Sequence, residues 1–251
     1  MTQPAEYSCL AGKTALLTGA AGAIGQAILR MLHRQGTKVY ALDRNTELQA
    51  LIEDEFAADP VQPVPVACDL LEIDDLKATI QSIGNTVGQI DLVINCAGDD
   101  TRQDWLKVDQ DAWDLSQGLN LRHVFFATQS AFEFMGNKGA VVNLGSKNAV
   151  TKKGGVVGYA TAKAGIMGLT GSLAREVGEQ GIRVNCVMPG LVETERNYQK
   201  WITPETEMRV LERQCLKSVC QPEDVANLVV FLCSSQSRMI SGQTIAIDGG
   251  S

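Results

Sequence analysis

The sequence has little of what would place it in a membrane, at a metal or on a nucleic acid. Aromatic residues are only 5% of the chain, and no uncharged apolar run reaches the roughly eighteen residues typical of a membrane-spanning helix. No two cysteines have the Cys-x-x-Cys spacing of metal sites. The opening segment, MTQPAEYSCLAGK, lacks the basic region and apolar stretch of a signal peptide. We therefore expect a soluble, cytoplasmic protein with no membrane segment and no metal.

Positive charge is also scarce, because 22 Lys and Arg compare with 29 Asp and Glu and give a net charge of −7. A surface for nucleic acid or anionic lipid is therefore not expected, although a local basic pocket is compatible with an acidic chain. The seven cysteines are odd in number and scattered, which favours free thiols in a reducing cytosol. At 251 residues the chain can form one large α/β domain or two small ones.

What the chain does contain is an alternation of short β-type runs with longer helix-type segments. Most β-type runs are continuously apolar, as expected for strands covered on both faces of a parallel sheet. The pattern predicts a doubly wound α/β fold with a parallel sheet (a Rossmann fold) in a single domain, 1–251. Residues 191–219 interrupt the alternation and are predicted to form a small lid beside the site. The predicted strands lie within 13–19, 37–43, 63–69, 89–98, 139–146, 181–190 and 242–250, with helical periodicity at 25–35 and 222–234.

The segment 13–32, KTALLTGAAGAIGQAILRML, has the pattern of a strand, a glycine-rich turn and an amphipathic helix. This order places backbone N–H groups and a helix N-terminus beneath a pyrophosphate. A glycine-rich turn by itself is also compatible with a simple tight connection between strand and helix. The candidate phosphate-binding residues are Gly19, Gly22, Ala23 and Ile24.

An acid stands at the end of the second predicted strand, roughly 20 residues after the glycines. Asp43 there can accept both hydroxyls of a ribose and would repel a 2′-phosphate, which favours NAD over NADP. The alternative is an ordinary turn acid. Arg44 is a candidate either to pair with a phosphate or to stack on adenine. Asp69, followed by Leu70, ends the third predicted strand and is expected near the adenine amine.

Two functional side chains, Tyr159 and Lys163, lie four positions apart in the small-residue run GYATAKAG. On a helix this spacing puts both on one face. Lowering a tyrosine pKa of about 10 by two to three units needs roughly 3 to 4 kcal/mol. An ammonium about 4 Å away supplies about that much at an effective dielectric near 20. The pair is therefore a candidate general acid/base, and the alternative is a Tyr/Lys pair on a solvated face.

Two more polar residues favour the catalytic interpretation. Ser146 closes the predicted strand 139–146, and the ends of parallel strands are where α/β sheets place ligands. Asn120 lies in an apolar helical segment, GLNLRHVFFATQ, where an amide without a role is costly.

Together these motifs resemble the single-domain NAD(P)-dependent short-chain dehydrogenases. The resemblance rests on segments in order over nearly the whole chain: 18–25, 95–98, Asn120, Ser146, Tyr159 with Lys163, and Pro189-Gly190. It implies that Tyr159 is the acid/base, that Lys163 lowers its pKa and holds the ribose, and that Ser146 hydrogen-bonds the reacting oxygen. Asn120 would kink its helix and hold a water near Lys163. Further cofactor contacts implied are Asn95, Ala97, Gly98, Gly190, Val192 and Thr194. Ala23 and Cys96 depart from the family's usual glycine and asparagine.

Within that family, the segment 194–217 and the acids after Gly98 resemble the NAD-dependent sugar 1-dehydrogenases, which oxidise the anomeric C–OH of an aldose to a lactone. The implied substrate contacts are Ser146, Tyr159, Asn148, Asp99 and Arg102. The loop after Ser146 adds Lys147, Lys152 and Lys153, which either form a solvated turn or bind an anionic substituent of the sugar. A 3-oxoacyl-thioester reductase and a non-catalytic NAD(H)-binding regulator are the alternative functions. The family resemblance also implies a homo-oligomer, a tetramer paired through the helix around Tyr159.

Overall fold

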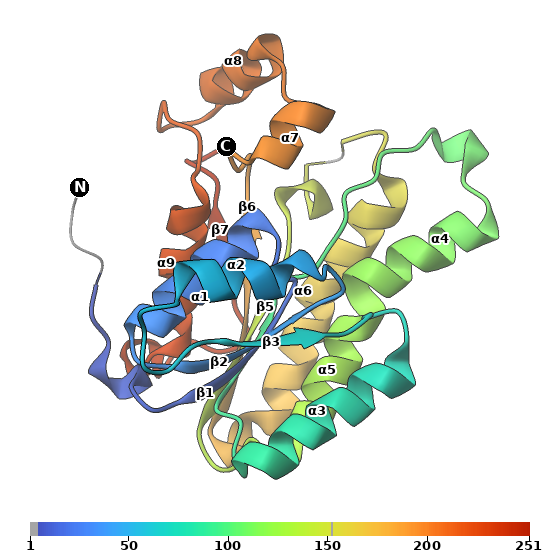
Figure 1. Ribbon diagram of the computed structural model, residues 1–251. Coiled ribbons are helices and arrows are strands. Elements are labelled where there is room, and N and C mark those ends of the chain that lie inside the picture. The colour runs from blue at the N-terminus through green and yellow to red at the C-terminus, as the bar shows by residue number, and fades with distance from the viewer. Residues whose placement is uncertain (1–4, 152) are drawn as a thin grey trace.

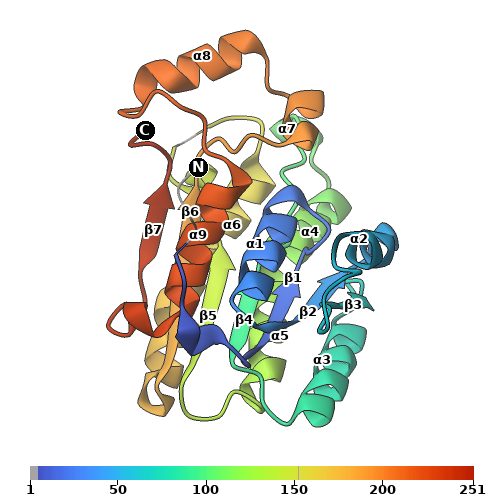
Figure 2. The same ribbon diagram turned by 60° about the vertical axis from the view of Figure 1, so that its left-hand side comes forward.

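The computed structural model describes residues 5–151 and 153–251, which form a seven-stranded parallel sheet in the order β3-β2-β1-β4-β5-β6-β7. The predicted doubly wound α/β fold is confirmed. All strands run in one direction, so their carboxyl ends share one edge of the sheet (Figure 2). The strands are β1 (Thr14–Thr18), β2 (Lys38–Asp43), β3 (Val64–Ala67), β4 (Leu92–Asn95), β5 (Gly139–Leu144), β6 (Ile182–Pro189) and β7 (Thr244–Ile247).

Helices cover both faces of the sheet (Figure 1). Buried side chains of α1, α2 and α9 pack on one face, and those of α3, α5 and α6 pack on the other. The helices are α1 (Ala23–Arg34), α2 (Glu47–Glu55), α3 (Ile73–Val87), α4 (Gln110–Gln117), α5 (His123–Phe132), α6 (Val157–Val177), α7 (Glu195–Lys200), α8 (Pro204–Arg213) and α9 (Pro222–Cys233).

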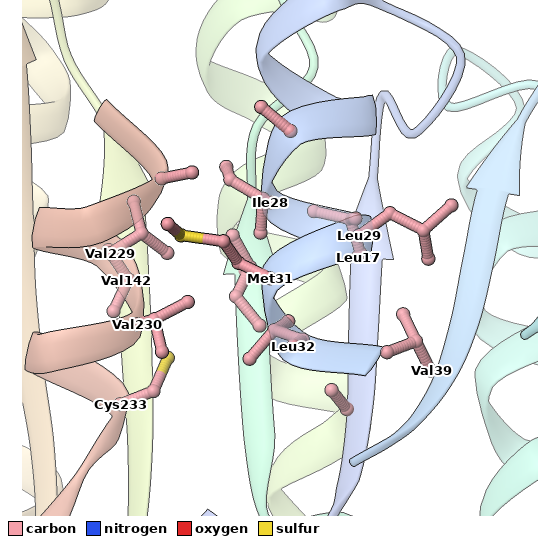
Figure 3. Close-up of a cluster of buried hydrophobic side chains, with 14 of the residues drawn as sticks. Leu17, Ile28, Leu29, Met31, Leu32, Val39, Val142, Val229, Val230 and Cys233 are labelled. Atoms are coloured by element: carbon pink, nitrogen blue, oxygen red, sulfur yellow. The ribbon is translucent and has the colours of Figure 1, made fainter. Parts of the chain in front are cut away.

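The apolar stripe of α1 explains how the glycine-rich loop is held in place. Ile28, Leu29 and Leu32 are completely buried, and they face α9 and the strands beside it (Figure 3). Burying each such side chain contributes about 1.5–3 kcal/mol. The start of α1 is therefore fixed against the carboxyl end of β1.

The strand register brings the segments after β1, β4 and β5 to one height. Thr18 pairs with Asn95, and Asn95 pairs with Asn143. The strand order reverses between β1 and β4, which is the point where open α/β sheets bind their ligands.

Residues 191–219 leave the sheet after β6 and carry α7 and α8 above its carboxyl edge (Figures 1 and 2). A parallel bridge joins Val192 to Cys220, and the Glu193 N–H donates to the Cys220 carbonyl over 2.8 Å. The segment is also fastened to the C-terminal residues, because the Leu216 N–H donates to the Gly249 carbonyl over 2.9 Å.

Candidate active site

A cavity of about 1040 Å³ lies along the carboxyl edge of the sheet. It is lined by the glycine-rich loop, the loops after β2 to β6, and α7 and α8. Of the residues predicted from the sequence, those that line it are Gly19, Gly22, Ala23, Ile24, Asp43, Arg44, Asp69, Leu70, Ala97, Gly98, Asp99, Arg102, Ser146, Asn148, Tyr159, Lys163, Gly190, Val192 and Thr194. Asn95 and Asn120 do not line it.

The glycine-rich loop forms a cradle that side chains would fill. Gly19 has φ +70°, and a Cβ on it would lie 2.6 Å from the Cα of Ala97. A Cβ on Gly25 would lie 2.1 Å from the Gly19 carbonyl oxygen. Gly22 is the N-cap residue of α1 and has no side chain to cap the first turn. The N–H groups of that turn therefore fit the pyrophosphate of a dinucleotide. Ala23 is exposed at the cavity wall.

Asp43 is fixed at the end of β2 by two backbone groups. Its carboxylate accepts a hydrogen bond from the Ala21 N–H over 3.0 Å and another from the Asn45 N–H over 3.0 Å. Asp69 accepts from the Leu71 N–H over 3.0 Å. Both acids line the β2–β3 end of the cavity, which we call the adenosine end, and their carboxylates can accept hydrogen bonds from ribose hydroxyls or a base; Arg44 lines the same end.

The side chain of Asn95, predicted to contact the cofactor, faces the core instead. It is completely buried and donates to the Asn143 Oδ1 over 2.9 Å and to the Thr128 Oγ1 over 3.2 Å. The side chain of Asn95 thus ties β4 to β5 and α5, and its contact with the cofactor stays a prediction. Sequence reasoning assigned no role to Thr18, whose hydroxyl accepts from the N–H groups of Cys96 and Ala97. A threonine ending the first strand was the available signal.

Asn120 lies in a π-helical turn, Gly118–Arg122, between α4 and α5. Its side chain accepts from the Asp99 N–H over 2.9 Å and donates to the Asp99 carbonyl over 3.0 Å. A Cβ on Gly98 would lie 2.9 Å from the Asn120 Oδ1 and 3.1 Å from the Lys163 Nζ. Asn120 therefore positions the loop after β4 beside Lys163. The water predicted near it stays a prediction.

Tyr159 and Lys163 lie one turn apart near the start of α6, next to the loop that carries Ser146. The Lys163 ammonium is buried, donates to the Leu144 carbonyl over 2.8 Å and lies 5.8 Å from the centroid of the Tyr159 ring. The Ser146 hydroxyl accepts from the Asn148 N–H over 3.2 Å. The alternative of a solvated Tyr/Lys face is therefore wrong.

The pKa values of these groups differ from the sequence prediction. Burial raises the pKa of Tyr159 to about 12, and the hydrogen bond with Ser146 opposes this. Burial lowers the pKa of Lys163 to about 8, and only the thiols of Cys96 and Cys186 act in the other direction. The expectation that Lys163 by itself lowers the tyrosine pKa is thus corrected. Its ammonium is directed at the Leu144 carbonyl, and the desolvation of the phenol is the larger effect.

The end of the cavity on the side of Tyr159 and α8, which we call the lid end, is rich in charge. Arg196 from α7 donates to Asp99 over 2.8 Å and to Asp100 over 3.2 Å. Burial alone would raise the pKa of Asp99, but the Thr101 hydroxyl and the Arg196 charge hold it below its usual value. Sequence reasoning missed Arg196, because nothing in its local pattern shows which acids it meets.

The lysines after Ser146 separate into two roles. Lys147 pairs with Asp248 and donates to the Ser251 carbonyl, so its charge is used within the chain. Lys153 lines the cavity with its ammonium 5.3 Å from the centroid of the Trp201 ring. Lys152 lies outside the described residues.

Comparisons with known proteins agree with this geometry. The family model described as enoyl-(acyl carrier protein) reductase matches residues 19–251. The chain is 40% identical to a D-xylose 1-dehydrogenase of Caulobacter vibrioides over 246 residues, 97% of each protein. It is 35% identical to the protein described as "Probable galactose dehydrogenase" of Rhizobium meliloti over 254 residues, 100% of this chain and 99% of that one. A 3-oxoacyl-[acyl-carrier-protein] reductase of Thermotoga maritima is 32% identical over 243 residues, 96% and 98% of the two chains.

Solved structures show the same fold. A dehydrogenase/reductase from Sinorhizobium meliloti superposes with a TM-score of 0.89 at 30% identity and 97% coverage of both chains. A short chain dehydrogenase from Burkholderia cenocepacia in complex with NADP gives 0.89 at 29% identity and coverage of 96% and 98%. Fold, site and relatives define a nicotinamide-dependent oxidoreductase that acts on CH–OH groups. The chain belongs to the short-chain dehydrogenase/reductase family.

Within residues 5–151 and 153–251, no helix has the length and apolar character needed to cross a membrane. The same residues contain no group of three or more His, Cys, Asp or Glu side chains placed to hold a metal ion.

Proposed function

We propose that the protein oxidises the anomeric C–OH of an aldose to a lactone with NAD as the hydride acceptor. The observation that carries the proposal is the lid end of the cavity, where Asp99, Asp100 and Arg196 line the wall together with Tyr159 and pair with one another. Charged and polar groups beside the acid/base suit a polyhydroxylated substrate. The names of the relatives from Caulobacter vibrioides and Rhizobium meliloti support a sugar.

The proposed reaction divides between two side chains and the cofactor. The nicotinamide ring supplies the acceptor for the hydride that leaves the anomeric carbon. Tyr159 takes the proton of the anomeric hydroxyl, and the Ser146 hydroxyl donates a hydrogen bond to the oxygen that becomes the carbonyl. The C–H and O–H bonds break, the C=O bond forms, and the products are a lactone, NADH and a proton.

The tyrosine needs positive charge nearby to work as a base, because burial raises its pKa to about 12. Lys163 alone does not lower that pKa, but with a pKa of about 8 it is mostly protonated at pH 7, and we infer that it acts on the phenol through the bound cofactor. Ribose hydroxyls bound to Lys163 would connect the ammonium to the phenol. We assign the residues roles on this basis: Tyr159 is the acid/base, Lys163 its charge partner, Ser146 the oxyanion donor and Asn120 a positioning residue.

The preference for NAD is inferred from Asp43. A carboxylate held at the end of β2 in the cavity wall accepts ribose hydroxyls and repels a 2′-phosphate. Arg44 also lines the cavity, and related structures bind NADP, so a direct comparison of the two cofactors is required.

The alternative function is reduction of a 3-oxoacyl thioester, favoured by the relative from Thermotoga maritima. An acyl chain would need an apolar groove beside Tyr159, whereas Asp99, Asp100 and Arg196 occupy that place. A regulator that only binds NAD(H) would not use a buried lysine beside a tyrosine. A cytoplasmic location and a homotetramer remain part of the proposal, and sedimentation of the purified protein tests the second.

The test is a panel of aldoses, deoxy sugars and acidic sugars with NAD or NADP, followed by NADH or NADPH absorbance, with hydroxylamine trapping of the lactone. We expect turnover of at least one aldose, a higher kcat/KM with NAD, and a trapped lactone. Reduction of a 3-oxoacyl thioester with no sugar oxidised would overturn the proposal. Cofactor binding with no turnover of any alcohol would favour the regulator.

A further inference from the structure

The lid end of the cavity is positively charged in a chain whose net charge is −7. Six cations of the described residues line it. Lys147 pairs with Asp248, and Arg196 pairs with both Asp99 and Asp100. Among residues 5–151 and 153–251, no carboxylate forms an ion pair with any of the other four cations. These four are Arg102, Lys153, Arg209 and Arg213.

Two of them lie over the Trp201 ring, and Arg209 lines the same cavity. We call Arg102, Lys153, Arg209 and Trp201 the Trp201 cluster. The Arg102 guanidinium lies 4.3 Å and the Lys153 ammonium 5.3 Å from the centroid of the Trp201 ring. Burial and the charges of Arg102 and Arg209 together hold the pKa of Lys153 below its usual value, opposed by Asp100. Cation–π contacts offset part of this repulsion. The indole N–H of Trp201 is a further buried donor without an acceptor among the described residues.

The members of the cluster come from segments far apart in the sequence. Arg102 follows β4, Lys153 lies between β5 and α6, Trp201 follows α7, and Arg209 is on α8. Three segments that are far apart in the sequence thus place cations in one part of the cavity. No carboxylate of the described residues pairs with these cations there. Repulsion of this kind is unfavourable in the free protein, and an anionic group of a ligand would relieve it.

The cluster is at the lid end of the cavity, and the phosphates of the cofactor have other partners. The pyrophosphate fits the start of α1, and the ribose end faces Asp43 beside β2. Lys153, Arg209, Asp100 and Tyr159 line one cavity, and Asp100 pairs with Arg196 of the lid end. A substrate whose anomeric carbon lies at Tyr159 can therefore extend its far end towards the cluster.

We propose that the Trp201 cluster binds an acidic group at the end of the sugar remote from the anomeric carbon, so that the substrate is an anionic aldose. The inference rests on the proposed function and adds the substrate class. The shared chemistry is a carboxylate, sulfonate or phosphate on the terminal carbon. Such a group accepts charge-assisted hydrogen bonds from Arg102, Lys153 and Arg209 at once. Of the lysines suspected from the sequence, Lys153 belongs to this site, whereas Lys147 is used by Asp248 and Ser251.

The test compares kcat/KM with NAD for glucose, glucuronic acid, the C6-sulfonate analogue of glucose and glucose 6-phosphate. A charged hydrogen bond contributes about 1.5 to 3 kcal/mol, and the cluster is open to solvent, so we expect at least one acidic sugar to exceed glucose by about 10-fold. The acidic sugar with the largest kcat/KM relative to glucose identifies whether the site binds a carboxylate, a sulfonate or a phosphate. The preference should fall as ionic strength rises, because these charges are screened by salt.

Variants assign the preference to the cluster. Lys153→Met and Arg209→Gln should each lower the acidic-to-neutral ratio about 10-fold, through KM rather than kcat. The matched control is Arg238→Gln, which removes one positive charge from an exposed side chain after α9, outside the cavity, and should leave the ratio unchanged.

Two outcomes separate the failure of this inference from the failure of the proposed function. If glucose is oxidised faster than every acidic sugar and the variants leave the ratio unchanged, the cluster is not an anion site, although the protein still oxidises sugars. If no sugar reacts and a 3-oxoacyl thioester is reduced, both proposals are wrong.

Discussion

The two ends of the cavity are built in different ways. At the adenosine end and in the pyrophosphate cradle beside it, the chain uses mainly the backbone of the turn after β1, together with the carboxylate of Asp43, which accepts from the Ala21 N–H. At the lid end it uses side chains from the loops after β4 and β5, from α7 and from α8. A backbone cradle binds what all dinucleotides share. A set of long charged side chains from separate segments is suited to discriminate between substrates.

Tyr159 lies where the two ends meet, and its removal should give the largest effect. Tyr159→Phe should lower kcat by about 100- to 10,000-fold, the usual contribution of a general acid/base, while both ends still bind. The measurements are kcat for the best sugar and the NADH dissociation constant by fluorescence titration. The control is Tyr198→Phe on the exposed face of α7, which should leave both unchanged. A near-normal kcat in Tyr159→Phe would contradict the role of Tyr159 as the acid/base.

Lys163 lies one helical turn from Tyr159, and at this residue function and stability should separate. Its pKa falls from 10.5 in the unfolded chain to about 8 in the folded protein, because the ammonium is buried. At pH 7 the folded state thus carries a charge that costs about 3 kcal/mol relative to water. Lys163→Met should abolish turnover yet raise the free energy of unfolding by about that amount.

The stability gain of Lys163→Met should depend on pH, because the lost side chain titrates. A basic group whose pKa is lowered by folding destabilises the folded protein most at pH values below its folded-state pKa. This penalty disappears as the pH rises to the pKa of the group in the unfolded chain. The advantage of Lys163→Met should therefore be full below pH 8 and vanish near pH 10.5 in paired urea unfolding curves. A variant that is less stable than the natural protein at pH 7 would contradict the assignment of a buried ammonium.

The same difference between the two ends explains what the sequence could predict. Strands with continuous apolar residues, the glycine-rich turn and the Tyr159/Lys163 spacing are local patterns, and each specifies its own geometry. Arg196 and Trp201 contact residues about fifty to a hundred positions away, and no local pattern contains that information. The direction of the Asn95 side chain was unpredictable for a related reason, since it depends on Thr128 and Asn143.

A change confined to the adenosine end should affect only the choice of cofactor. Asp43→Ala removes the repulsion of a 2′-phosphate and also the acceptor for the Ala21 N–H. We expect the NADP-to-NAD ratio of kcat/KM to rise about 10-fold, with Arg44 able to pair with the phosphate. The matched variant Asp43→Asn keeps an acceptor without the charge, and separates the two roles. The acidic-to-neutral sugar ratio should be unchanged in both variants, and a change there would mean that the two ends are coupled.

The smallest effect should come from substituting Lys147. This lysine also lies at the lid end, but its role is structural, in contrast to the cations of the Trp201 cluster. Its partner Asp248 is nearly buried, and the pair fastens the C-terminal residues beside Ser146. Lys147→Met should lower the free energy of unfolding by about 1 kcal/mol, between the values for surface and buried pairs, and change kcat/KM by less than about threefold.

The pH dependence of Lys147→Met identifies the partner of the lysine. Burial would raise the pKa of Asp248, but Lys147 and the Gly250 N–H hold it below its usual value of 3.8. An acid whose pKa is lowered by folding stabilises the folded protein at pH values above its pKa in the unfolded chain. This contribution is lost as the pH falls through the pKa of the acid in the folded protein. The stability difference between Lys147→Met and the natural protein should therefore be constant from about pH 5 to 8 and shrink below about pH 4. The acidic-to-neutral sugar ratio should stay constant, in contrast to Lys153→Met. If Lys147→Met changes that ratio as strongly as Lys153→Met does, Lys147 contacts the substrate and the division of the two lysines is wrong.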